Sequence, residues 1–298
     1  MKRFFNRLTS SEAVAGYTFL LPNFLGFLLF TSLPVLASLV LSFMDWDILT
    51  PPKFAGITNF VNLYHDKLFW QYVGNTLYLM ANIPITMVGA LLVALLMNQK
   101  LRGIVVYRTI YFLPSVCSGV AVCLLWKWLY NPDFGLINTM LSHIGIQHGP
   151  DWLSSTVWAK PALMLMGLWG AVGGMNMILY LAALQGVPPE LYEAAEIDGA
   201  NAWQKFKAIT LPFLSPTTFF IGIMAVIGGF QGGFMSAFIM TGGGPAGSTT
   251  TIEYYIYNNA YQWFKMGYAA SIAWVLFLVV LVITLFNWRF GGKLVQYN

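Results

Sequence analysis

Charged side chains are concentrated in one polar stretch, residues 190–212, which stands between two strongly apolar segments. The stretch carries four of the eleven acidic residues of the chain: Glu190, Glu193, Glu196 and Asp198. Carboxylates in the first turns of a helix interact favourably with its dipole and can pair with basic groups of a partner. The sequence shows no Ser/His/Asp arrangement, carboxylate pair or metal-ligand cluster beside them. These residue types therefore predict a docking element and no catalytic centre.

Two short helices are expected within this stretch. Pro188 and Pro189 mark the start of the first helix, and Gly199 marks its end. The second helix is expected to begin at Asn201, a residue type suited to the N-cap, and to break at Pro212. Apolar residues recur at helical spacing between these limits: Trp203, Phe206 and Ile209.

The composition places these helices in a membrane protein. Of 298 residues, 58% are hydrophobic and 9% are charged, and the mean hydropathy is +0.66. So few charges cannot cover a soluble globule of this size. Apolar runs of about 20 residues or more, long enough to cross a bilayer, occur at 14–43, 72–97, 104–129, 158–184, 213–240 and 268–288. The sequence therefore predicts an all-α polytopic membrane protein with six transmembrane helices in a single domain, 1–298.

The distribution of basic residues predicts the orientation of these spans, because cytoplasmic loops carry an excess of Lys and Arg. Ten basic residues fall on one side: Lys2, Arg3, Arg7, Lys100, Arg102, Arg108, Lys205, Lys207, Arg289 and Lys293. Five fall on the other: Lys53, Lys67, Lys127, Lys160 and Lys265. Both termini and the polar loop 186–212 are therefore expected in the cytoplasm.

Ionisable groups are nearly absent from the centres of the predicted spans. Arg108 and Lys127 lie near opposite ends of the third span, where long side chains can reach the interfaces. The spans hold no carboxylate or histidine relay, no series of regularly spaced arginines and no repeated selectivity-filter signature. These features argue against a proton-coupled carrier, a voltage sensor and an ion channel.

Neither the cysteines nor the histidines are arranged to bind a metal. Cys117 and Cys123 lie six residues apart in one apolar run and face different sides of a helix. His65, His143 and His148 fall in predicted loops without an HExxH motif or a Cys/His cluster. No metal site is predicted.

The glycine-rich run 241–245 does not match a phosphate-binding loop, because it lacks the GxxxxGK[ST] pattern and has no lysine nearby. It is expected to be a turn on the outer side of the membrane. The chain is therefore not expected to hydrolyse a nucleotide or to carry a cofactor of its own.

Glycine and neutral polar side chains are concentrated in the fourth and fifth spans. Tight packing of helices explains most such glycines, but Gln231 is an amide at membrane depth that needs a partner or water. Aromatic faces combined with amides and hydroxyls suit a neutral, hydroxyl-rich ligand. The candidate ligand contacts are Trp169, Gly173, Asn176, Tyr180, Phe230, Gln231, Gly233, Phe234 and Ser236.

The polar stretch resembles a known signature. Glu193-Ala194-Ala195 is followed after three residues by Gly199, and after nine more by Ile209, Thr210, Leu211 and Pro212. This spacing is similar at every signature position to the EAA motif of membrane subunits of binding-protein-dependent ABC importers. Residues 107–114, 131–138 and 240–245 resemble the carbohydrate branch of that family, the maltose and oligosaccharide type. The resemblance covers nearly all of the chain from the second span onward.

The resemblance implies a fold and a set of partners. The fold is the transmembrane domain of a type I ABC importer, in its compact six-span form. The subunit would be a multi-pass protein of the prokaryotic cytoplasmic (inner) membrane and part of a heteromeric complex. It would work with a second homologous permease subunit, an extracytoplasmic solute-binding protein and two ATP-binding subunits, which bind the ATP and Mg. Nucleic acid is not among the expected partners.

The resemblance also assigns roles to residues. The loop 186–212 would hold the coupling helix, which docks on an ATPase subunit and transmits ATP-driven closure as alternating access. The implied coupling residues are Glu190, Tyr192, Glu193, Ala194, Ala195, Asp198 and Gly199. In the maltose type, asparagine or tyrosine occupies several cargo-contacting positions that are glycine here, at Gly173, Gly232 and Gly233. The pocket is then either roomier or shared with the partner subunit.

Two alternative functions remain open at this point. The cargo of such an importer could be another polar solute, such as a phosphorylated polyol, although few basic groups face the predicted pathway. A stand-alone channel or secondary carrier is the other alternative, and the lack of ionisable groups in the spans argues against its proton-coupled form.

Overall fold

The computed structural model describes residues 12–99 and 102–291. The predicted cytoplasmic basic residues Lys2, Arg3, Arg7, Lys100 and Lys293 lie outside the described residues. Contacts group the chain into two compact units. One holds residues up to His65 together with Ile256–Val275, and the other holds Asp66–Tyr255 together with residues from Leu276 on.

The first unit contains the two short strands and the long helical segment that precedes them. Its elements are α2 (Glu12–Phe27), η1 (Leu28–Ser32), α3 (Leu33–Ser42), β1 (Met44–Asp45), β2 (Lys53–Phe54), α4 (Thr58–His65), η4 (Asn258–Gln262) and the start of α17 (Met266–Gly291). The label η denotes a π-helical turn. The two short strands pair antiparallel, with Met44 opposite Phe54. The Asn59 side-chain amide donates to the carbonyls of Ser42 and Met44, both at 2.9 Å. A Cβ on Gly267 would lie only 1.8 Å from the Met44 carbonyl oxygen, so α17 can start here only with glycine.

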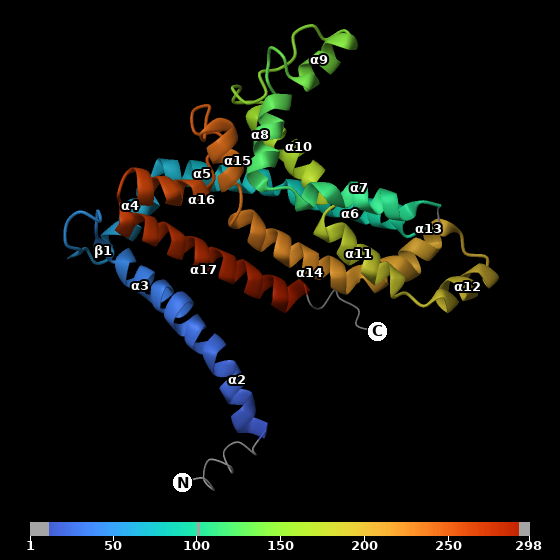
Figure 1. Cartoon of the computed structure of the whole chain (residues 1–298), viewed down its shortest axis with the longest axis horizontal. Coiled ribbons are helices and arrows are strands. Elements are labelled where there is room, and N and C mark those ends of the chain that lie inside the picture. Colours follow the sequence, from blue (N-terminus) through green and yellow to red (C-terminus); the bar gives the residue numbers. More distant parts are fainter. Residues whose placement is uncertain (1–11, 100–101, 292–298) are drawn as a thin grey trace. The chain divides into compact units, whose positions relative to one another are not determined.

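The second unit contains most of the helices, and most of them are visible in Figure 1. Its elements are α5 (Lys67–Met80), α6 (Asn82–Met97), α7 (Ile104–Val116), α8 (Gly119–Leu129), α9 (Leu136–His143), α10 (Ala159–Val172), α11 (Met175–Gln185), α12 (Pro189–Ile197), α13 (Ala202–Lys205), η2 (Phe206–Thr210), α14 (Leu211–Phe230), α15 (Phe234–Ser236) and η3 (Ala237–Thr241). The helix α16 (Ile252–Tyr257) follows the glycine-rich loop and crosses into the first unit.

The core of this unit lies where α6, α11 and α14 meet. Ala90 and Ala94 on α6 are fully buried, and their small side chains allow α11 and α14 to approach closely. The buried side chains that fill this contact are Val93, Met97, Met177, Tyr180, Leu181, Leu184, Leu214 and Ile221. A second cluster joins α8, α10 and η3 through Cys123, Trp126, Tyr130, Ala162, Leu163 and Met240.

The described residues contain five helices that are long and apolar enough to cross a membrane, or six with one bent pair counted as a span. The five are Val14–Ser42, Lys67–Met97, Ala159–Gln185, Ala202–Phe230 and Met266–Arg289. The prediction of an all-α polytopic protein is therefore confirmed. The predicted first, second, fourth and sixth spans agree with these helices to within a few residues.

The third predicted span, 104–129, is wrong as a straight helix. It consists of α7 and α8, which meet at an angle of 96°. Pro114 lacks the N–H group that would continue the hydrogen-bond ladder, and Cys117 and Ser118 adopt extended backbone with ψ of 143° and 132°. In Figure 1, α8 turns away from α7 and leads to α9 at its far end.

The fifth predicted span, 213–240, is also wrong in its limits. The helix starts earlier, at Ala202, and ends at Phe230. Gly233 has a φ of +93°, and a Cβ there would lie 2.6 Å from the Thr251 methyl group. The conformation and the close approach together require glycine at this position. Helical structure resumes at Phe234 and continues to Thr241.

Two prolines that the spans contain are accommodated by π-turns. The turn η1 directly precedes α3, which has Pro34 at its second position, and η2 directly precedes α14, which has Pro212 at its second position. A proline removes one backbone donor and crowds the preceding turn, and a locally wider turn relieves both problems. The expectation that Pro212 ends the second short helix is therefore wrong, because α13, η2 and α14 form one continuous helix.

The glycine-rich loop after the fifth span is held by α5. The Asn75 side-chain amide donates to the carbonyls of Gly247 and Thr250 at 2.8 and 3.0 Å, and Thr76 accepts from the Ile252 N–H at 3.1 Å. Gln71, one turn before Asn75, donates to the Ala246 carbonyl at 3.1 Å. The loop is thus fixed by a polar stripe of α5 that lies about 175 residues earlier in the chain.

Glu253, just after this loop, caps the break in the fifth span. Its Oε2 atom accepts a hydrogen bond from the Phe234 N–H at 3.1 Å, at the first residue of the resumed helix. Burial raises the pKa of the Glu253 carboxyl above its usual range, and this hydrogen bond offsets part of the shift. The burial of Glu253 therefore carries an electrostatic cost when its carboxyl is ionised, and the capping contact offsets part of that cost.

We expect Asn75→Ala to destabilise the protein by about 2–3 kcal/mol, because the buried Thr250 carbonyl and the partly buried Gly247 carbonyl lose their donor. Gln71→Ala is the matched control, since its contact with the same loop is exposed, and we expect a change of less than about 0.5 kcal/mol. Thermal unfolding of the purified chain in detergent measures both effects. An Asn75→Ala protein as stable as the wild type would contradict this role of α5.

Glu253→Gln is expected to stabilise the protein as the pH rises. The raised pKa means that the folded state holds the proton more tightly than the unfolded state. The wild type therefore loses stability as the pH rises from the ordinary glutamate pKa through the raised one. Glutamine keeps the acceptor for the Phe234 N–H without the charge, whereas Glu253→Ala removes the acceptor and should cost about 1 kcal/mol. Unfolding midpoints between about pH 4 and pH 8 test the difference. Parallel curves for the wild type and Glu253→Gln would disprove it.

Candidate functional site

The polar stretch folds into the helix α12 followed by a tight turn. Pro189 occupies the first position of α12, where its missing N–H is not needed. After Ile197 the chain reverses at Gly199, which has a φ of +79°. The Ala200 N–H donates to the Ala195 carbonyl at 2.8 Å, and the Gly199 N–H donates to the Glu196 carbonyl at 3.0 Å. This pair of bonds is a Schellman motif and satisfies the end of α12.

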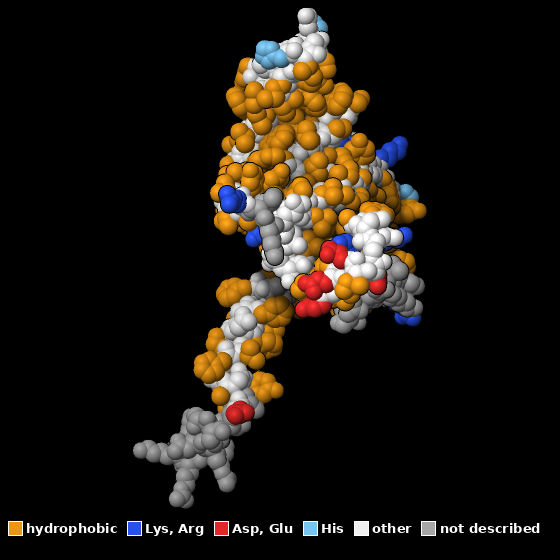
Figure 2. Space-filling view, turned by 90° about the vertical axis from the view of Figure 1, so that its right-hand side faces the viewer, with side chains coloured by type: hydrophobic (Ala, Val, Ile, Leu, Met, Phe, Trp, Pro, Cys, Tyr) orange, Lys and Arg blue, Asp and Glu red, His pale blue; other side chains and the backbone are white. Residues whose placement is uncertain are grey.

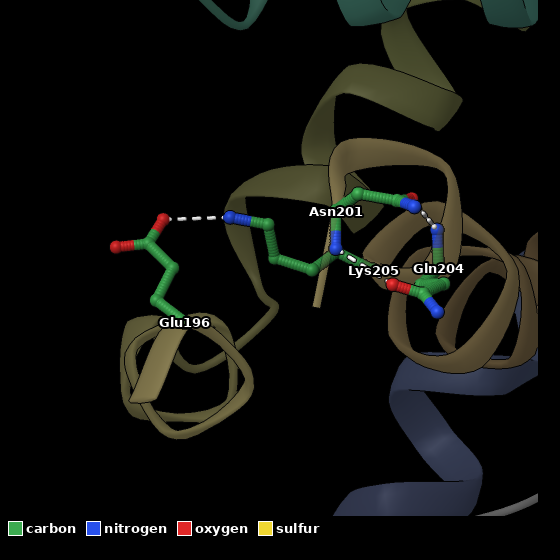
Figure 3. Close-up of polar contacts among 4 residues, drawn as sticks. All are labelled: Glu196, Asn201, Gln204 and Lys205. Carbon is green, nitrogen blue, oxygen red and sulfur yellow. Dashed lines mark hydrogen bonds and ion pairs between the residues drawn. The ribbon is translucent and has the colours of Figure 1, made fainter. Parts of the chain in front are cut away.

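The next helix starts with a capping box. Asn201 accepts a hydrogen bond from the Gln204 N–H at 2.9 Å, and the Gln204 side chain accepts from the Asn201 N–H at 2.7 Å (Figure 3). The prediction that Asn201 is the N-cap is confirmed. The helix that begins here runs without interruption to Phe230 at the break in the fifth span. The polar stretch and the break are therefore the two ends of one helix.

Two side-chain contacts fasten α12 to this helix. The hydroxyls of Tyr192 and Thr210 are 2.8 Å apart, and Thr210 is buried. The Lys205 ammonium lies 2.6 Å from the Glu196 carboxylate (Figure 3). The hydrogen bond and charge of Lys205 lower the pKa of the Glu196 carboxyl. Since Glu196 is exposed, water screens this pair, and it orients α12 more than it stabilises the fold.

The opposite side of α12 carries an exposed stripe of four residues: Glu190, Glu193, Ala194 and Ile197. Their spacing of i, i+3, i+4 and i+7 places them on one face of the helix. Figure 2 shows the acidic side chains gathered on this part of the surface. Ile197 is 88% exposed, and an aliphatic side chain so placed between carboxylates is suited to an apolar contact with a partner. We call these four residues the α12 stripe.

The other predicted coupling residues differ in which side of α12 they occupy. Tyr192 and Ala195 are half-buried and belong to the inner side of α12, while Asp198 is exposed at its end. Sequence reasoning missed Ile197 as part of the site. Its spacing of seven residues from Glu190 and four from Glu193, which places an apolar side chain on the acidic face of the helix, was the signal that could have identified it.

A first cavity, of about 240 Å³, lies beside the break in the fifth span. Of the predicted ligand contacts, Gly233 and Ser236 line it. The polar residues Thr76, Asn82 and Thr251 also line it, and sequence reasoning missed all three. The Asn82 amide donates to the Met164 carbonyl at 2.9 Å, and Ser236 donates to the Gly233 carbonyl at 3.0 Å. We call this space the break cavity.

A second cavity, of about 440 Å³, lies in the angle between α7 and α8 and is closed by α10. Its lining includes Trp169 and Gly173, with Tyr111 and Trp126. The rings of Trp126 and Trp169 are 5.8 Å apart in an edge-to-face arrangement. A Cβ on Gly173 would lie 2.0 Å from the Tyr111 carbonyl oxygen, so this glycine lets α10 and α7 pack closely. We call this space the elbow cavity.

The remaining predicted ligand contacts are scattered. Tyr180 and Phe230 are buried, at 1% and 4% exposure, and Tyr180 belongs to the core between α6 and α11. Asn176 is half-buried on α11, and Phe234 stacks on Phe238 with ring centroids 5.4 Å apart. The Gln231 side chain is exposed at the break. The predicted set is thus divided among two cavities, the core and the break.

Comparison with known proteins agrees with this architecture. The lactose transport permease protein LacF of Rhizobium radiobacter is 39% identical over 277 residues, covering 91% of this chain and 92% of that protein. The probable ABC transporter permease protein YesP of Bacillus subtilis is 37% identical, over 98% of this chain and 95% of its own length. A solved bacterial ABC transporter that imports the acidic polysaccharide alginate matches with a TM-score of 0.86, at 27% identity, over 99% of this chain and 100% of that chain.

The family match includes both the α12 stripe and the break in the fifth span. The family described as binding-protein-dependent transport system inner membrane component matches residues 54–290. This range covers well over half of the chain, and several relatives exceed 30% identity over nearly their whole length. The chain therefore belongs to the family of inner membrane components of binding-protein-dependent transport systems.

Proposed function

We propose that this chain is the permease subunit of an ABC importer that moves a sugar or oligosaccharide across the cytoplasmic membrane by ATP-driven alternating access. Relatives that support a carbohydrate cargo include LacF, the arabinooligosaccharide permease AraP of Halalkalibacterium halodurans and the trehalose/maltose permease MalF of Thermococcus litoralis, at 39%, 33% and 32% identity. The solved alginate transporter also imports a carbohydrate, and a second structure holds it with a periplasmic protein bound to an alginate pentasaccharide.

The observation that carries the mechanism is the continuous helix from Ala202 to Phe230. Its 29 residues correspond to a length of roughly 43 Å at 1.5 Å per residue. At one end it is fastened to α12 through Tyr192 and Glu196, and at the other end it stops at the break cavity. A displacement of α12 is therefore transmitted to the break as a rigid-body movement.

The partner at the α12 stripe is proposed to be an ATP-binding subunit on the cytoplasmic side, docked on the loop 186–212. Glu190 and Glu193 offer charges to basic residues at the rim of a cleft, Ala194 permits close approach, and Ile197 fills its apolar floor. A second homologous permease subunit and a second ATP-binding subunit complete the complex. ATP and Mg bind to those subunits, and the residues of this chain supply only the contact through which their closure acts.

The cargo pathway is proposed to pass the break in the fifth span. Irregular backbone at membrane depth is tolerated where it lines a cavity, and the break borders one with hydroxyl and amide groups in its wall. The lining of the break cavity contains no charged side chain, which suits a neutral, hydroxyl-rich solute.

Glu193→Lys is expected to reduce sugar uptake and binding-protein-stimulated ATPase activity by at least about ten-fold, because the charge facing the ATPase cleft is reversed. The complex should still assemble in the membrane. The control is Asp133→Lys, a charge reversal on an exposed turn between α8 and α9, which should leave both activities unchanged. Transport by reconstituted vesicles gives the measurement. Normal uptake by the Glu193→Lys importer would refute the proposed coupling role.

Substitutions of Gly199 are expected to form a graded series. Alanine at a φ of +79° is strained by about 1–2 kcal/mol, although a Cβ there meets no atom within 4 Å. Proline cannot adopt this conformation and also removes the N–H that bonds to Glu196. Gly199→Ala should therefore lower coupled ATPase activity several-fold, and Gly199→Pro should abolish it. Wild-type ATPase activity in both variants would show that the turn geometry is not needed for coupling.

A further inference from the structure

A third cavity, of about 230 Å³, lies at the end of α8. It is bounded by the last turn of α8, by the turn that follows at Asn131 and Pro132, by residues 151–154 and by the end of η3. It shares no lining residue with the break cavity or the elbow cavity. We call it the loop pocket.

The apolar wall of the loop pocket is a fixed pair of aromatic rings. Tyr130 and Trp152 have ring centroids 5.5 Å apart at an interplanar angle of 34°. Their polar atoms are already engaged: the Tyr130 hydroxyl donates to the Ala162 carbonyl at 2.8 Å, and the Trp152 indole N–H donates to Asn138 at 2.7 Å. The rings are therefore held in place, and the half-buried Trp152 offers carbon surface to the pocket, with Tyr130, only 1% exposed, packed behind it.

The polar wall offers both donors and acceptors. Lys127 donates to the Ile239 carbonyl at 3.1 Å, which holds the ammonium at the pocket and leaves two of its three protons for a ligand. The Oδ1 atom of Asn131 accepts from two backbone N–H groups of its own turn, so its amide N–H groups remain as donors. Asp151 supplies an exposed carboxylate, and it forms no ion pair with Lys127 although both line the pocket.

We propose that the loop pocket binds one neutral sugar ring of the cargo. A ring hydroxyl both donates and accepts, so it can use the carboxylate and the ammonium together, while the C–H face of the ring packs on Trp152. An anionic ligand would face the Asp151 carboxylate, and a cationic ligand would face the Lys127 ammonium. The volume is below the roughly 300–1,000 Å³ of sites for drug-sized ligands, which limits the occupant to a single ring.

This inference rests on the proposed function, in which the chain imports a sugar and the loop 186–212 faces the cytoplasm. In that orientation the end of α8 lies on the outer side of the membrane. There the pocket would receive a terminal ring of the cargo before it reaches the break cavity. The pocket is thus assigned to cargo entry, whereas the α12 stripe is assigned to the ATP-binding subunit.

The test is the binding of methyl glucoside, methyl glucuronide and glucosamine to the full chain in lipid nanodiscs, measured by saturation-transfer NMR. We expect methyl glucoside to bind best and Asp151→Asn to weaken its binding about five- to ten-fold, because asparagine keeps an acceptor oxygen but turns a charge-assisted hydrogen bond into a neutral one. The control is Asp133→Asn, an exposed carboxylate of the same loop region that does not line the pocket, and it should bind as the wild type does.

Three results would overturn the proposal: no binding of methyl glucoside by the wild type, no effect of Asp151→Asn, or equal binding of methyl glucuronide. Sugar uptake by the wild-type importer in vesicles is measured in parallel. Absence of that uptake contradicts the proposed function, whereas normal uptake together with any of the three binding results contradicts the loop pocket alone. In one further outcome, Asp151→Asn binds methyl glucoside as the wild type does but loses the stimulation of ATPase activity by the binding protein. That result would identify the pocket as a surface for docking the binding protein, and it would also overturn the proposal.

Discussion

The constraint on which this structure depends is the need to satisfy every backbone N–H and C=O group within apolar segments. A membrane offers no water to an interrupted helix, yet the third and fifth spans are both interrupted. At the fifth span, side chains from elsewhere in the chain support the interrupted region. Glu253 accepts from the Phe234 N–H at the fifth span, Lys127 donates to the Ile239 carbonyl at the end of η3, and Asn75 holds the loop that follows.

The same constraint explains why some prolines do not interrupt a helix. Pro34 and Pro212 each follow a π-turn, in which the N–H of residue 33 or 211 bonds to a carbonyl five residues earlier. The wider turn absorbs the missing donor and the bulk of the ring locally. At Pro212 this solution has a functional consequence, because it keeps the polar stretch and the fifth span in one helix. A helix that ended there would separate α12 from the break by a flexible joint.

Local features of the sequence were sufficient to predict the first helix of the polar stretch, its turn and the start of the next helix, but not the continuation of that helix past Pro212. Pro189, Gly199 and Asn201 act on backbone groups within a few residues of themselves, so their types reveal the helix start, the turn and the cap. Whether a span is straight or bent cannot be predicted from such local features. Hydropathy reports that residues 104–129 are apolar, but the 96° angle depends on the extended backbone of Cys117 and Ser118, which hydropathy does not register. Gly233 was visible in the sequence, yet its close contact with Thr251 depends on a loop that α5 holds in place.

The residues proposed to contact an ATP-binding subunit lie on one helix, whereas those proposed to contact the cargo come from several helices. This difference determines which of the two sites can be predicted from the sequence. The α12 stripe occupies one helix, and its supports, Thr210 and Lys205, are at most 18 residues away. The break cavity draws on α5, α6, α10 and α14, so its lining spans 176 positions, from Thr76 to Thr251. A motif can record the first arrangement because all of it lies in one short segment. The second depends on how four helices pack, and a change in any of them alters the cavity without altering the motif. The proposed contact with an ATP-binding subunit can therefore stay the same while the side chains proposed to meet the cargo change.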